Sequence, residues 1–329
     1  MTSPNESVHA VPVTHTPPPH PEVAPSGGQG GQGRSLWHHA DFRRLWAGDT
    51  ASQLGVALGA LAIPYLAVTV LHANEFQMGL LATLGGLGFL IIGLPAGAIV
   101  DRYAKRSIML LVDLLRALLL LSLPVAGWLG LLGIVQVMVV ATAIGMSTVF
   151  FDVSYQSYLP LLVHRDHVVE GNAKLQASQS VSMAAGPAIG GLVLTWLGAL
   201  PVIGVNAVGY LLSAVGLSRI RHRETPAPRA HRRPMRVEIA EGLRFIVRHP
   251  LLRRLIACTG LGNLAGAAIG ALIVLYQVRD LHLSALTIGI VDSAAAVGGL
   301  FGALITTRLA RRIGEGAAIT VTAAAMLVC

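Results

Sequence analysis

From residue 45 onward, the chain alternates between long apolar runs and short charged segments. A helix needs roughly 20 apolar residues to cross a hydrocarbon core about 30 Å thick. Most of the runs approach this length, and the last one meets the end of the chain. The pattern therefore predicts a helical membrane protein with about nine membrane helices. The predicted runs are residues 45–71, 78–100, 107–128, 131–153, 175–197, 200–218, 255–276, 285–306 and 316–329.

Two pairs of neighbouring runs have almost no residues between them. They meet near residues 128–130 and near residues 198–201, so each pair is predicted to form a helical hairpin. Residues 1–36 are rich in Pro, Gly, Ser, Thr and His and lack apolar periodicity, which predicts a disordered tail. The irregular spacing of the histidines in this tail does not favour a metal site.

Composition supports a membrane protein independently of the runs. The chain is 53% hydrophobic and only 12% charged, too few charges to cover the surface of a soluble protein. The net charge of +8 would suggest a nucleic-acid partner in a soluble protein, but here the positions of the charges indicate membrane topology instead. The two cysteines, Cys258 and Cys329, both lie in apolar runs and indicate no disulfide or metal site.

Basic residues in short loops are retained on the cytoplasmic side of a membrane. With the N-terminus inside, Arg279 alone lies outside and Arg116 alone lies within the membrane. The sequence therefore predicts a cytoplasmic N-terminus. The residues placed inside are Arg43, Arg44, Arg102, Lys105, Arg106, Arg165, Lys174, Arg308, Arg311, Arg312 and eleven arginines from Arg219 to Arg254.

The chain contains an internal repeat. Phe42-Arg-Arg-Leu-Trp-Ala47 matches Leu252-Arg-Arg-Leu-Ile-Ala257, 210 positions later, and Met78-Gly-Leu80 matches Ile288-Gly-Ile290 at the same spacing. The seventh run therefore repeats the first in the same orientation, which predicts two parallel halves related by an axis along the membrane normal. The expected domains are a tail (1–36), a six-helix bundle (37–219), a cytoplasmic linker with an amphipathic helix (220–249) and an incomplete second bundle (250–329).

The loop between the second and third runs carries the pattern G-x-x-x-D-R-x-x-[KR]-R, and it resembles the signature of the major facilitator superfamily of transporters. The resemblance implies that fold and a conformational latch, a charge network that holds one state of the transporter. The alternative is that the basic residues only obey the positive-inside rule. The latch residues are Gly97, Asp101, Arg102, Lys105 and Arg106, with a second-half counterpart in Arg308, Arg311 and Arg312.

A glycine and proline cluster in the fifth run resembles the G-x-x-x-G-P-x-x-G-G motif associated with export by antiport, with Ser182 in place of the first glycine. Small residues allow close helix packing, and proline interrupts the hydrogen-bond ladder. The same residues could serve packing alone in an importer. The run Glu241–Arg254 resembles the start of helix seven in bacterial exporters of the macrolide-efflux and enterobactin-exporter type. The motif residues are Gly186, Pro187, Gly190 and Gly191.

Ionisable residues within membrane helices are costly and face the protein interior. Asp113 and Arg116 lie three residues apart and are expected to pair, either as a structural ion pair or in substrate binding and proton coupling. Asp49, with Gln53 one turn later, and Asp292 are the other candidates for a substrate or proton path. Asp152, Asn206 and Asn263 complete the polar set and could simply join helices.

The expected function is a secondary transporter in a bacterial-type inner membrane. The sequence has no phosphate-binding G-x-x-x-x-G-K-[ST] motif, which favours an ion gradient as the energy source, and no enzyme site or cofactor is expected. Export of small amphipathic compounds by proton antiport is the leading hypothesis, with membrane lipids as neighbours, no nucleic acid and a monomeric state. The alternatives are uptake of a metabolite, or a truncated chain that is inactive or serves as an interaction protein.

Overall fold

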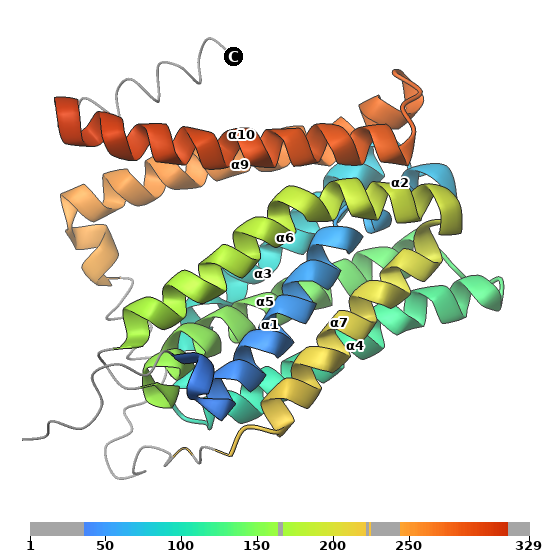
Figure 1. Cartoon of the computed structure of the whole chain (residues 1–329). Coiled ribbons are helices and arrows are strands. Elements are labelled where there is room, and N and C mark those ends of the chain that lie inside the picture. Colours follow the sequence, from blue (N-terminus) through green and yellow to red (C-terminus); the bar gives the residue numbers. More distant parts are fainter. Residues whose placement is uncertain (1–35, 164–166, 222–223, 225–243, 315–329) are drawn as a thin grey trace, which may run out of the picture. The chain divides into compact units, whose positions relative to one another are not determined.

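The computed structural model describes residues 36–163, 167–221, 224 and 244–314, and the chain forms two units, Met1–Ser35 and Leu36–Cys329. All described residues belong to the second unit, and they form helices and turns without a β-strand (Figure 1). The elements are η1 (Leu36–His38), α1 (Ala40–Gly59), α2 (Ala62–Thr69), α3 (Glu75–Val100), α4 (Lys105–Trp128), α5 (Ile134–Leu162), α6 (Val168–Leu197), α7 (Ala199–Ser218), α9 (Pro250–Arg279) and α10 (Ala285–Ile313).

The predicted all-α membrane protein is confirmed. Among the described residues, six segments are long and apolar enough to cross a membrane, with α1 and α2 counted as one. The helices α3 and α9 are of comparable length, 26 and 30 residues. The predicted run 316–329 lies outside the described residues. Of the predicted amphipathic helix 235–247, residues 244–247 are described, and they are helical.

Both predicted hairpins are present. Residues 129–133 separate the end of α4 at Trp128 from the start of α5 at Ile134. A single residue, Gly198, separates α6 from α7. Gly198 adopts φ 78°, a backbone conformation that residues other than glycine rarely adopt. The chain can therefore reverse direction there within one residue.

Several helices extend further than their apolar runs, among them α5 and α6. The fourth run was predicted to end at residue 153, but α5 continues to Leu162. The polar residues that follow are not a loop, because Ser154 and Tyr158 are both fully buried inside the bundle. Likewise α6 begins at Val168, seven residues before the predicted start of the fifth run. Hydropathy therefore marks the apolar part of these helices and misses their more polar extensions.

Close backbone contact joins α1 to α7. A Cβ atom added at Gly216 would lie 2.7 Å from the carbonyl oxygen of Arg44, and one at Gly209 would lie 2.9 Å from that of Ala51. Helices in lipid gain little from apolar burial against each other, so small residues that permit such approach stabilise the contact through dispersion. Gly204, on the same helix α7, has no neighbour within 4 Å of its Cβ position.

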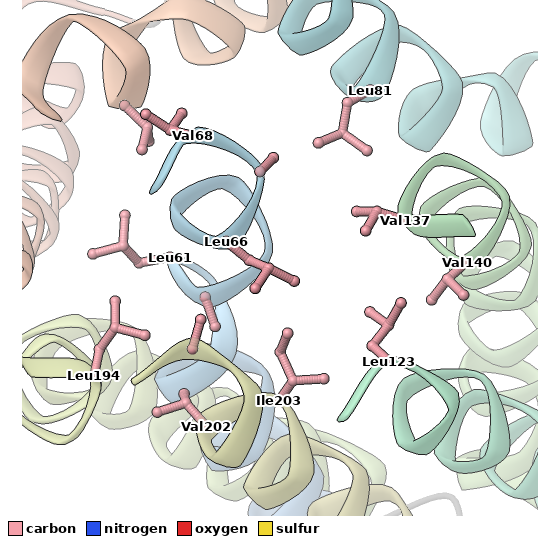
Figure 2. Close-up of a cluster of buried hydrophobic side chains, with 14 of the residues drawn as sticks. Leu61, Leu66, Val68, Leu81, Leu123, Val137, Val140, Leu194, Val202 and Ile203 are labelled. Atoms are coloured by element: carbon pink, nitrogen blue, oxygen red, sulfur yellow. The ribbon is translucent and has the colours of Figure 1, made fainter. Parts of the chain in front are cut away.

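The apolar core has two parts. One surrounds α2, and Figure 2 shows Leu66 of this helix among side chains from several helices, including Leu123 of α4 and Ile203 of α7. The other lies at the opposite ends of the same helices and includes Phe42 of α1 and Tyr158 of α5. The stretches of α1, α4, α5 and α7 between these two clusters carry the buried polar residues discussed below.

The internal repeat is visible in the backbone. The starts of α1 and α9, the starts of α3 and α10, and the ends of α2 and α9 each differ by the same 210 positions. The turns after α2 and α9 also match, because His72 and His282 both adopt positive φ, 51° and 50°. The hydrogen bond from Ala73 N to Ala67 O is repeated by the bond from Leu283 N to Gln277 O. The two halves thus repeat down to individual turns.

The backbone repeat is broken between α1 and α2. The first segment is interrupted between Gly59 and Ala62, whereas α9 continues through the equivalent positions. Asn206 of α7 lies against this break, since a Cβ at Gly59 would come within 2.8 Å of the Asn206 amide nitrogen. A side chain at position 59 would therefore displace Asn206.

We expect Gly216→Ala to destabilise the first half by about 1–3 kcal/mol, because the added methyl group overpacks the α1 to α7 contact. The matched change Gly204→Ala, in open space on the same helix, should be neutral or stabilise by about 0.5–1 kcal/mol. Thermal unfolding of the purified protein in detergent measures both. Equal melting temperatures for the two variants would show that glycine contacts do not determine this packing.

Candidate functional site

A buried polar layer separates the two apolar clusters. Asp49 on α1 is 5% exposed, Asp113 on α4 is 0% exposed and Arg116 on α4 is 3% exposed. The predicted pairing on α4 is present, with Arg116 Nη1 3.4 Å from Asp113 Oδ1. Because both side chains are shielded from solvent, the pair interacts more strongly than a surface pair and is costly to break.

The Arg116 guanidinium also lies over two aromatic rings, one from α5 and one from α7. Its central carbon is 4.9 Å from the ring centre of Phe151 and 5.1 Å from that of Tyr210. Cation–π contacts of this kind add stabilisation where water is excluded. Among the described residues, Arg116 Nε and Nη2 and Asp113 Oδ2 have no hydrogen-bond partner. Ser213 of α7 also interacts with the Asp113 carboxylate, so the unused capacity lies mainly in the donors of Arg116.

Asp49 is surrounded by polar side chains from two helices. Gln53 of α1 and Tyr155 of α5 approach its carboxylate as hydrogen-bond donors, and the charges of Asp113 and Asp152 act on it. Asp152 is half-buried, and it also interacts with the charge of Arg116. Asp49 thus interacts with the other two carboxylates, Asp113 and Asp152, and both of these interact with Arg116. Such an arrangement can bind, hold and exchange protons.

Asp292, the remaining candidate, is placed elsewhere. It is exposed on α10, and the electrostatic interactions of Asp49, Asp113 and Asp152 do not include it. The structure therefore brings together four of the five candidate residues, all from the first half, and leaves out Asp292.

The candidate latch loop joins α3 to α4. Asp101 caps the C-terminal end of α3 through its backbone and is exposed. In the part of the chain that the structure describes, its carboxylate forms no hydrogen bond or ion pair. Gly97, one turn earlier, has no neighbour within 4 Å of its Cβ position. The Asp101 side chain and the Cβ position of Gly97 therefore make no close contact in the state observed.

A different carboxylate occupies the start of α4. Glu224, just after α7, accepts hydrogen bonds from the backbone nitrogens of Lys105 and Arg106, each at 2.7 Å. These amides have no partner within the helix, and the helix dipole favours an anion there. The Arg106 side chain in turn donates to the carbonyl oxygens of Leu217 and Ser218 at the end of α7, at 2.8 and 2.6 Å.

The second-half basic residues differ in backbone setting from their proposed counterparts. Arg308, Arg311 and Arg312 lie inside α10, near its C-terminal end. Arg102 lies in the turn between helices, and Lys105 and Arg106 begin α4. The cations of α10 are thus placed to interact with its helix dipole, whereas those of the first half flank a turn.

The glycine and proline motif joins α6 to two different helices. Gly186 and Gly190 face α1, and a Cβ at either would lie within 2.3 Å of Ala57 or Leu58. Gly191 faces α10, where a Cβ would lie 2.4 Å from the carbonyl oxygen of Ala285. The motif therefore connects the first half to the second as well as packing the first half internally.

The contact between α6 and α10 is reinforced next to Pro187. The Ser293 hydroxyl oxygen accepts a hydrogen bond from the backbone nitrogen of Ala188 at 2.9 Å. A Cβ at Gly289 would lie 2.1 Å from the carbonyl oxygen of Pro187, so this position also requires glycine. Further along the two helices, away from the α9 to α10 turn, they separate around an open apolar groove of about 370 Å³. Its lining residues are Ser180, Val181, Ala184, Ala185, Val297 and Leu300.

Several site residues were missed from sequence. Tyr155, Phe151 and Tyr210 were not singled out, although the spacing of Phe151, Tyr155 and Tyr158 along one helix face was available as a signal. Glu224 lies in the segment 220–249, which was predicted to be a cytoplasmic linker, and no role was predicted for it. The contact between Ser293 and Ala188 joins residues 105 positions apart, which no local pattern reveals.

The solved structure of a bacterial homologue of the human lysosomal transporter Spinster has a similar fold. The TM-score is 0.64 at 14% identity, covering 85% of this chain and 64% of that one. The helices, their repeat and this likeness show the major facilitator superfamily fold, the predicted fold class. Within that class, the family model described as transmembrane secretion effector matches residues 35–329, and the chain belongs to that family.

Two curated relatives are exporters by name. The multidrug efflux pump Tap of Mycolicibacterium fortuitum is 30% identical over 222 residues, covering 64% of this chain and 53% of Tap. The enterobactin exporter EntS of Escherichia coli is 25% identical over 282 residues, covering 84% of this chain and 66% of EntS. The chain thus spans between about half and two thirds of these relatives. Family members of this kind are bacterial inner-membrane proteins, as the sequence predicted.

Arg116→Gln should destabilise the protein by about 3–5 kcal/mol, because it leaves the buried carboxylate of Asp113 without its cation. The double variant Arg116→Gln with Asp113→Asn should recover part of the loss, since no unpaired charge remains at the pair. Melting temperatures of the single and double variants in detergent test this. Additive losses would show that the two side chains do not stabilise each other.

Glu224→Gln should weaken the cap of α4 by about 0.5–2 kcal/mol, the usual range for a lost N-terminal cap. We expect faster hydrogen exchange at the amides of Lys105 and Arg106, measured by mass spectrometry. Asp101→Asn is the matched control in the adjacent turn and should leave these amides unchanged. The reverse order would show that Asp101 caps this helix in solution.

Proposed function

We propose that this protein exports small amphipathic compounds from the cytoplasm by proton antiport, through alternating access. The observation that carries the proposal is the contact of α6 with α10 beside an open groove. Helices of the two halves meet through Gly191 and Gly289 near the α9 to α10 turn and separate toward their other ends. With the predicted orientation, the turn is outside, so the groove opens toward the cytoplasm.

The direction of transport rests on two further supports. The Gly186-Pro187 motif resembles that of antiport exporters, and here it joins the two halves. Tap is named a multidrug efflux pump and EntS an enterobactin exporter. The groove is lined mainly by aliphatic residues, which suits the apolar part of an amphipathic substrate. Uptake of a metabolite is the second candidate, since the same packing residues would serve an importer.

Proton coupling is proposed from the polar layer. Asp49 has hydrogen-bond donors as neighbours, Gln53 and Tyr155, and it interacts with the charge of Asp152, which is half-buried and therefore more accessible than Asp49. We assign Asp49 and Asp152 to proton exchange. We assign Asp113 and Arg116 to a structural pair that fixes the charge around them. The domain plan of a six-helix bundle, a cytoplasmic linker and a second bundle belongs to the same proposal, as does a monomeric state in contact with lipid.

The latch role of the loop after α3 also remains a proposal. In the state observed, Arg106 holds the end of α7, and Glu224 holds the start of α4. These contacts lie on the cytoplasmic side of the first half, so the loop is fixed in place while the groove is open. We propose that Asp101 and Arg102 engage the second half when the groove closes.

The test is accumulation of a fluorescent amphipathic dye in energised cells. Cells would express this chain, or a version that includes any coding sequence beyond residue 329. We expect accumulation to fall severalfold, Asp49→Asn to abolish the fall, and an uncoupler to abolish it too. Asp280→Asn, at the outer end of α9, is the control and should export normally. Full export by Asp49→Asn would reject this carboxylate as the proton carrier, and unchanged accumulation in every form would reject broad efflux.

A further inference from the structure

Arg279 is the one cation that the topology places on the outer side. It is the last residue of α9, directly before the turn that repeats the turn after α2. Basic residues are retained inside, so an outer arginine is not explained by topology. Its repeat-related position in the first half is Thr69, whose hydroxyl only donates to the carbonyl of Tyr65 in its own helix. The arginine is therefore a feature of one half only.

The Arg279 side chain crosses between the halves. Its Nη2 donates a hydrogen bond to the carbonyl oxygen of Ala73 at 2.8 Å, and its Nη1 lies 3.5 Å from Oε1 of Glu75. Ala73 is fully buried in the first-half turn. The second-half turn is thus fastened to the backbone of its repeat partner.

The two contacts are unequal. The Glu75 side chain is 72% exposed, and exposed ion pairs contribute little because water and salt screen them. The hydrogen bond to Ala73 is shorter, involves a charged donor and reaches a backbone atom whose position is fixed by the turn. The carbonyl is therefore the main acceptor.

We propose that Arg279 is the outer gate residue of this transporter. Its guanidinium donates a hydrogen bond to the Ala73 carbonyl while the outer side is closed, and this bond breaks when the outer side opens. The inference rests on the alternating access proposed above, but on neither the substrate nor the coupling ion. Arg279 is a positioning residue: it sets the ratio of outer-closed to outer-open states and contacts no substrate.

The readout is the labelling of a cysteine within the outer contact. Ala285 is 2% exposed, and its carbonyl oxygen lies where α10 meets Gly191. A single cysteine, Ala285→Cys, in a chain with Cys258→Ser and Cys329→Ser, should react slowly with a membrane-impermeant maleimide added from outside. The reaction should speed up when the contact opens.

Arg279→Gln should raise the labelling rate about tenfold, the change in population expected from losing one charge-assisted hydrogen bond. Arg279→Lys should restore part of the slow rate, since an ammonium can still reach the carbonyl. Glu75→Gln should change the rate less than twofold. Arg254→Gln, the same change at an exposed arginine near the start of α9, is the control and should have no effect.

Equal rates for Arg279→Gln and Arg254→Gln would overturn the proposal. Equal acceleration by Glu75→Gln and Arg279→Gln would show that the ion pair with Glu75, and not the hydrogen bond to the Ala73 carbonyl, holds the outer side closed. This result would also overturn the proposal. Full reaction of every variant after denaturation shows that equal amounts are present, and the lysine variant keeps the test valid if the glutamine variant folds poorly. Because labelling requires no transport, absence of dye export would count against the proposed function and leave this inference standing.

Discussion

Backbone contact at glycine positions is the interaction on which this structure depends. In lipid, the tails compete equally for apolar side chains, so two helices gain by approaching closely rather than by hiding surface. The α1 to α7 contact at Gly216 and the α6 to α10 contact at Gly191 use the same device. The first stabilises one half and the second joins the halves, so the same physics builds both a permanent contact and one that transport would have to break.

The buried polar layer is the counterpart of this packing. Charges at membrane depth are tolerated only among protein groups that compensate them. Here Arg116 interacts with Asp113 and Asp152, and these two carboxylates interact with Asp49. The layer lies between two apolar clusters, so it is shielded from both ends. Such a layer is expensive as a purely structural element, because an apolar layer of similar volume would be cheaper. That cost is the physical argument for a role in function.

The sequence predicted the helices, the hairpins, the repeat and the Asp113 to Arg116 pair, because each depends on composition or on spacing within one helix. It did not predict Glu224 at the start of α4, whose partners are 118 and 119 positions away. The loop motif instead drew attention to Asp101. Hydropathy also underestimated the length of α5, because the polar residues Ser154 and Tyr158 in its last part are buried in the protein. Partners distant in sequence and polar inward faces are what local patterns cannot supply.

The outer contacts show why a duplicated fold need not behave symmetrically. The two turns have the same backbone conformation, with His72 and His282 both left-handed. Only the second turn is preceded by an arginine, Arg279 at the end of α9. Glycine contacts attract at short range and do not depend on direction, so they cannot favour one state once the helices part. A single directional hydrogen bond to a fixed carbonyl can favour one state over the other. Because states that interconvert must differ little in free energy, one bond of this strength is sufficient to bias them, and a network of many would hold the outer side closed.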